Sequence, residues 1–111
     1  MSSMPGPPDS YMRFINRYPK LDAAWQAIRE QGDEGPLDER TQRLIRIALA
    51  IGSANRGAVF TSVKKGLAVG VSPEEIEQVV ALAAGNLGLP ATATAYGWVR
   101  EVIERTMESQ K

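Results

Sequence analysis

The chain has 111 residues, of which 43% are hydrophobic, and its thirteen basic and thirteen acidic residues give a formal net charge of zero. It contains no cysteine and no histidine, which excludes disulfides, thiolate nucleophiles, thiolate or imidazole metal ligands and imidazole acid–base catalysis. The length suits a single domain, and the balanced charge provides no field that would attract nucleic acid or an anionic membrane.

Residues 1–8 are rich in Ser, Pro and Gly and lack the charged-then-apolar order of a signal peptide. No apolar run approaches the length of a membrane span. We therefore expect a flexible N-terminal tail over residues 1–8, a cytoplasmic location and no membrane partner.

Two helices are predicted in the first third of the chain. A short helix capped by Asp9 or Ser10 runs to about Asn16, and Pro19 suits the first turn of a second helix. The apolar residues of this second helix recur at helical spacing and form one stripe: Leu21, Ala24, Trp25 and Ile28. Gly32 suits its end, and residues 33–37 then form a loop.

The middle of the chain predicts two more helices. Asp38 is suited to cap the third helix, whose apolar stripe consists of Leu44, Ile47, Ala48 and Ile51. A turn is expected within residues 52–57. The fourth helix then buries Val59, Val63 and Leu67 and ends at Gly70.

The clearest local signal begins the fifth helix. Ser72 caps it, Pro73 occupies the first helical position, and Glu75 is placed to reach back to the cap. Its inward face holds Ile76, Val79, Val80 and Ala83. Residues 85–90 interrupt the pattern.

The last helix begins near Pro90 and carries an apolar stripe of Ala95, Trp98, Val99 and Val102. Its polar end over residues 105–111 is expected to fray. No stretch alternates like a strand, so the sequence predicts an all-α fold, a helical bundle of about six helices over residues 9–107, with residues 108–111 as a frayed C-terminus. Residues 81–97 are unusually small and indicate either tight packing inside the bundle or a subunit interface.

Three segments, in this order and spacing, resemble the carboxymuconolactone decarboxylase-like domain over about residues 37–104. They are Leu37-Asp38-Glu39-Arg40-Thr41 before an apolar helix, the stretch from Gly66 to Ile76 that ends in Val71-Ser72-Pro73-Glu74-Glu75-Ile76, and Gly88-Leu89-Pro90-Ala91. The resemblance implies an alkylhydroperoxidase D-like helical bundle that assembles into homo-oligomers, either trimers or hexamers.

The residues that carry chemistry in such proteins are replaced here. In the alkylhydroperoxidase D branch, the motif C-x-x-C-x-x-x-H would fall on Asn55, Ala58 and Ser62, and two glutamates would fall on Arg43 and Gln78. Disulfide exchange needs thiols, so thiol peroxidase activity is excluded.

In the lactone decarboxylase branch, one histidine position is again Ser62, and Thr92, Thr94 and Tyr96 occupy the region of the later histidines. The histidine-assisted mechanism therefore does not carry over, and the sequence leaves open whether the protein is an enzyme.

Four residues surround the position that the resemblance assigns to a site: Arg43, Asn55, Thr61 and Ser62. One hypothesis is that they bind an anionic or polar small molecule, because arginine pairs well with a carboxylate. The alternative is that Arg43 pairs with Glu39 one turn away and that Asn55 caps a helix. The acidic residues lack metal-ligand spacing, and we predict neither a metal nor a cofactor.

Two functions are consistent with these observations. The first is a family member without thiol peroxidase chemistry that binds or transforms a small polar or carboxylate metabolite. The second is a non-catalytic helical oligomer that acts as an interaction or regulatory module. A pocket with converging polar groups would favour the first, whereas a solid apolar core at the corresponding position would favour the second. In either case the expected partner is a second copy of the chain and not nucleic acid.

Overall fold

The computed structural model describes residues 9–110 of the chain. Within that range it contains six helices and no strand, which confirms the predicted all-α fold. The chain divides into two units, residues 1–37 and residues 38–111, and each is described by itself. The predicted tail over residues 1–8 lies outside the described residues.

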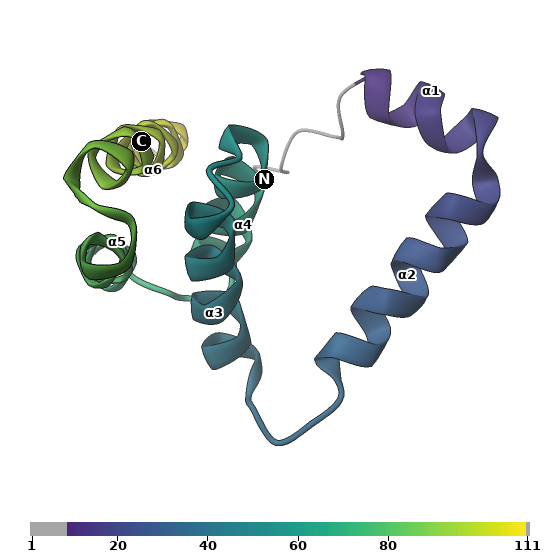
Figure 1. The fold of residues 1–111 in the computed structure, drawn as a ribbon, viewed down its shortest axis with the longest axis horizontal. Helices are drawn as coiled ribbons and strands as arrows, with labels where there is room; N and C mark the ends of the chain where they lie inside the picture. Colours follow the sequence, from purple (N-terminus) through teal and green to yellow (C-terminus); the bar gives the residue numbers. More distant parts are fainter. Residues whose placement is uncertain (1–8, 111) are drawn as a thin grey trace. The chain divides into compact units, whose positions relative to one another are not determined.

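The first unit consists of α1 (Asp9–Arg17) and α2 (Pro19–Asp33), which contact each other (Figure 1). Pro19 begins α2 as predicted. Neither helix contains a buried residue. The predicted apolar stripe of α2 is present, but Leu21, Trp25 and Ile28 are each at least half exposed.

The second unit consists of four helices: α3 (Glu39–Gly52), α4 (Arg56–Ala68), α5 (Pro73–Leu87) and α6 (Leu89–Ser109). Helix α3 packs against α4 and α5, and α6 packs against the same two helices from the other side (Figure 1). Each helix of this unit therefore buries a face against two others, and a common core lies between them.

The core of the second unit is aliphatic. Its buried members come from all four helices and from the α4–α5 connection: Ile47, Ala50, Ile51, Val59, Val63, Val71, Ile76, Val80, Ala95, Val99, Val102 and Ile103. Gly66 is buried among them, and a Cβ there would lie 3.0 Å from Cδ1 of Ile47. The missing side chain therefore lets α4 approach α3 closely.

The helix starts follow the predicted capping chemistry. Asp38 accepts a hydrogen bond of 2.7 Å from the backbone N–H of Thr41. Ser72 and Glu75 form a complete capping box at the start of α5.

The end of one helix differs from the prediction. Helix α5 passes through Gly85 and stops only at Gly88, which is the residue of that segment with positive φ (+82°). Helix α6 extends to Ser109, and Arg105 forms an ion pair with Glu101 one turn before it. The expected fraying of this end stays a prediction. Among the described residues, no helix is both long enough and apolar enough to cross a membrane.

Candidate functional site

The four residues predicted to bind a ligand are distributed over α3 and α4. Arg43 on α3 and Ser62 on α4 are half-buried, whereas Thr61 is exposed. Asn55 precedes α4, and its Oδ1 accepts a hydrogen bond of 2.9 Å from the N–H of Ala58. The alternative expectation that Asn55 caps a helix is thus confirmed.

No hydrogen bond or ion pair among residues 9–110 joins any two of these four side chains, and none joins Arg43 to Glu39. The face that α4 turns inward is apolar, formed by Val59, Val63 and Gly66. The contacts among the described residues thus do not bring these four side chains together, and the hypothesis that they bind a metabolite stays a prediction.

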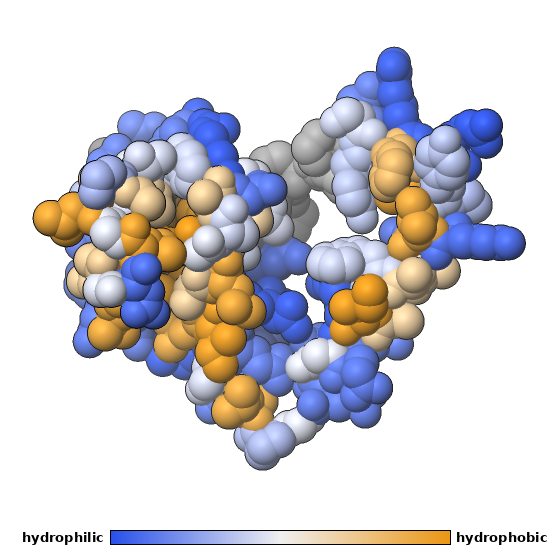
Figure 2. Space-filling model, in the orientation of Figure 1, coloured by the Kyte–Doolittle hydropathy of each residue, from blue (hydrophilic) through white to orange (hydrophobic). Residues whose placement is uncertain are grey.

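A hollow of the second unit lies elsewhere, between α3 and α5. It is an open groove of about 500 Å³, and Figure 2 shows apolar side chains gathered over this part of the molecule. Its apolar walls are formed by Leu44, Ile45, Ala48, Val79, Leu82, Ala83 and Leu87. Leu82 is 70% exposed and Ile45 is also exposed, so large apolar side chains of the groove are left uncovered by the other helices of the second unit.

Three polar residues also line the groove: Glu75, Gln78 and Asn86. Gln78 is the position where the sequence comparison with alkylhydroperoxidase D-type proteins expects a glutamate. An amide in that place can donate and accept hydrogen bonds but cannot act as a general base at neutral pH.

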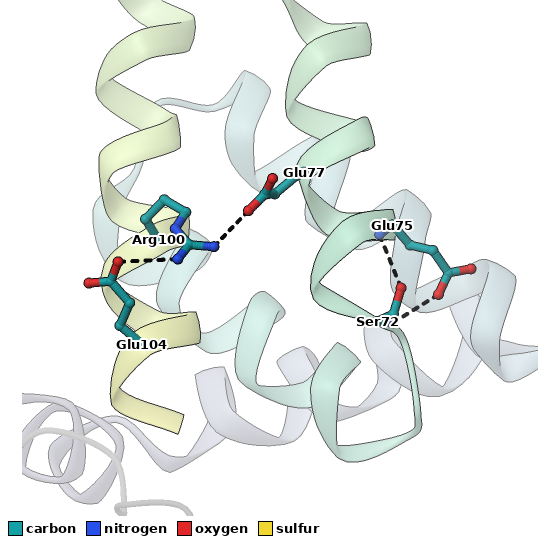
Figure 3. Close-up of polar contacts among 5 residues, drawn as sticks. All are labelled: Ser72, Glu75, Glu77, Arg100 and Glu104. Carbon is teal, nitrogen blue, oxygen red and sulfur yellow. Dashed lines mark hydrogen bonds and ion pairs between the residues drawn. The ribbon is translucent and has the colours of Figure 1, made fainter. Parts of the chain in front are cut away.

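The Glu75 carboxylate has two partners, and both contact its Oε1. It forms an ion pair with Arg40 and accepts a hydrogen bond of 2.8 Å from the N–H of Ser72, whose Oγ in turn accepts one of 3.1 Å from the N–H of Glu75 (Figure 3). Arg40 and the Ser72 N–H lower the pKa of Glu75 to about 2. This group is therefore charged at neutral pH and links the start of α5 to Arg40 of α3.

Other ion pairs join α6 to its neighbours. Arg100 lies between Glu77 of α5, at 2.7 Å, and Glu104, at 3.2 Å (Figure 3). On the opposite side, Arg56 contacts Glu101 at 3.3 Å and lies over the ring of Phe60, 4.2 Å from its centroid. These pairs orient α4, α5 and α6 with respect to one another. Over residues 9–110, no three acidic side chains come together as they would to hold a metal ion.

We expect a pH-dependent contribution to stability from Glu75. Its pKa is lowered from an ordinary value of 4.5 to about 2, so the folded state favours the charged form. The stabilisation is complete above pH 4.5 and is lost as the pH falls from 4.5 towards 2. Glu75→Gln keeps an acceptor for the capping box but removes the charge. Wild-type protein should therefore lose stability more steeply than this variant across that window.

The measurement is the free energy of unfolding from urea titrations at pH 7, 5, 4 and 3. Glu108→Gln, at the exposed end of α6, is the matched control and should follow the wild-type curve. A difference between wild type and Glu75→Gln that stays constant from pH 7 to pH 3 would contradict the prediction.

The class of protein is now defined: an all-helical protein with an aliphatic core, paired charges and an apolar groove, and without thiol or imidazole groups. The sequence pattern of the carboxymuconolactone decarboxylase family matches residues 19–101, well over half of the chain. The chain belongs to this family. The match begins at the first residue of α2, earlier than the start near Leu37 predicted from the motifs. The searches of curated proteins and of solved structures found no match.

Sequence reasoning missed the groove. Ile45 and Leu82 lie outside the apolar stripes predicted for their helices. Each adds a large apolar side chain beside the core-facing stripe, and this extra apolar residue is the sequence feature that could have indicated the groove. A helix with such a widened apolar face has apolar surface left over after its core-facing stripe is buried.

Proposed function

We propose that this protein is a non-catalytic helical module that self-associates, and that a second copy of the chain covers the groove between α3 and α5. The observation that carries the proposal is the exposure of large apolar side chains on this groove, foremost Leu82. A contiguous apolar patch of this kind on a small domain marks an interaction surface.

Covering the side chains of this groove would contribute favourable free energy to association. Burying one large aliphatic side chain contributes about 1.5–3 kcal/mol, and Ile45 and Leu82 both stand on the groove with much of their surface in solvent. A chain of 111 residues also has a limited core of its own, so association adds burial that the fold cannot supply internally. The family resemblance favours a trimer or a hexamer.

The chemistry of the groove supports a binding role without catalysis. Among the described residues that line it, the one acidic group is Glu75, whose Oε1 is paired with Arg40 and the N–H of Ser72. Neither a nucleophile nor a proton acceptor suited to neutral pH stands among the residues that line it.

A second candidate is a small, mainly apolar ligand in the same groove. The amides of Gln78 and Asn86 line it together with the apolar walls, and a volume of about 500 Å³ falls within the range of small-molecule sites. A ligand of this kind would be uncharged, in contrast to the carboxylate predicted for Arg43 and Ser62. Titration of both classes of compound, followed by NMR shifts near Gln78 and near Arg43, separates the two.

Leu82→Glu tests the proposal. A carboxylate on an apolar contact has no partner and must be desolvated, so we expect association to weaken by at least about 30-fold. The measurement is the molar mass by light scattering over a concentration series: wild type should give a multiple of 12.1 kDa, and the variant should approach 12.1 kDa.

Met107→Glu is the matched control, because Met107 is also an exposed apolar residue but does not line the groove. It should keep the wild-type mass. A wild-type mass of 12.1 kDa at every concentration would overturn self-association, and an unchanged mass for Leu82→Glu would overturn the assignment of the groove.

A further inference from the structure

We draw no further inference here: the strongest candidate, the apolar stripe of α2 formed by Leu21, Trp25 and Ile28, carries none because nothing in the structure shows what covers it.

Discussion

Ile76→Ala is expected to destabilise the protein by about 2–5 kcal/mol. The side chain of Ile76 is fully buried at the start of α5 and belongs to the core that all four helices of the second unit share. Truncation removes its transfer free energy and leaves a cavity that close-packed neighbours fill only in part. Since small domains have a total stability of about 5–15 kcal/mol, a substantial part of it depends on this side chain.

The measurement is urea unfolding followed by circular dichroism at one fixed protein concentration, since association contributes to apparent stability. Ile76→Val should lose about 0.5–1.5 kcal/mol of stability, a value between those of wild type and Ile76→Ala. Met107→Ala removes an apolar side chain that is mostly exposed and should change stability by less than about 0.5 kcal/mol. A loss below 1 kcal/mol for Ile76→Ala would show that the core does not close around α5 as described.

Gly88→Ala and Gly97→Ala are expected to have opposite effects. Gly88 joins α5 to α6 with φ +82° and ψ 159°, a backbone region that is essentially restricted to glycine. A Cβ at this position would have open space, so the cost is backbone strain alone, about 1–3 kcal/mol. Gly97 lies inside α6, where a Cβ also meets nothing within 4 Å, and alanine there should stabilise the helix by about 0.5–1 kcal/mol.

Thermal and urea unfolding of the two variants provide the comparison. The same methyl group is added in both, so a difference in sign isolates the backbone conformation as the cause. If Gly88→Ala kept wild-type stability, Gly88 would not have the positive-φ backbone conformation described for the connection between α5 and α6. The family-like segment Gly88-Leu89-Pro90-Ala91 has a structural explanation here. Gly88 turns the chain, its carbonyl accepts a 2.7 Å hydrogen bond from the buried Thr92 hydroxyl, and Pro90 lies in the first turn of α6.

The helices and their starting points could be predicted from the sequence because the interactions that define them are local. Asp38 binds the N–H of Thr41, and Ser72 and Glu75 bind each other's backbone, all within three residues. Exclusion of thiol and imidazole chemistry was equally secure, since it follows from composition.

The candidate site could not be predicted in the same way. Arg40 and Glu75 are far apart in the sequence, and so are Arg100 and Glu77, yet each pair forms an ion pair that occupies its carboxylate. Periodicity identified the apolar stripe of α2, but nothing in the sequence shows that this stripe has no partner within its own unit.

The sequence by itself thus determined about six amphipathic helices, most of their caps and the absence of thiol and imidazole groups. Only the tertiary structure decided which apolar residues enter the core and which, like Ile45 and Leu82, are left to line a groove. The physical reason is that a helix or a cap depends on residues within one turn of each other, whereas a groove exists only where two separate helices pack and leave part of their apolar surface uncovered.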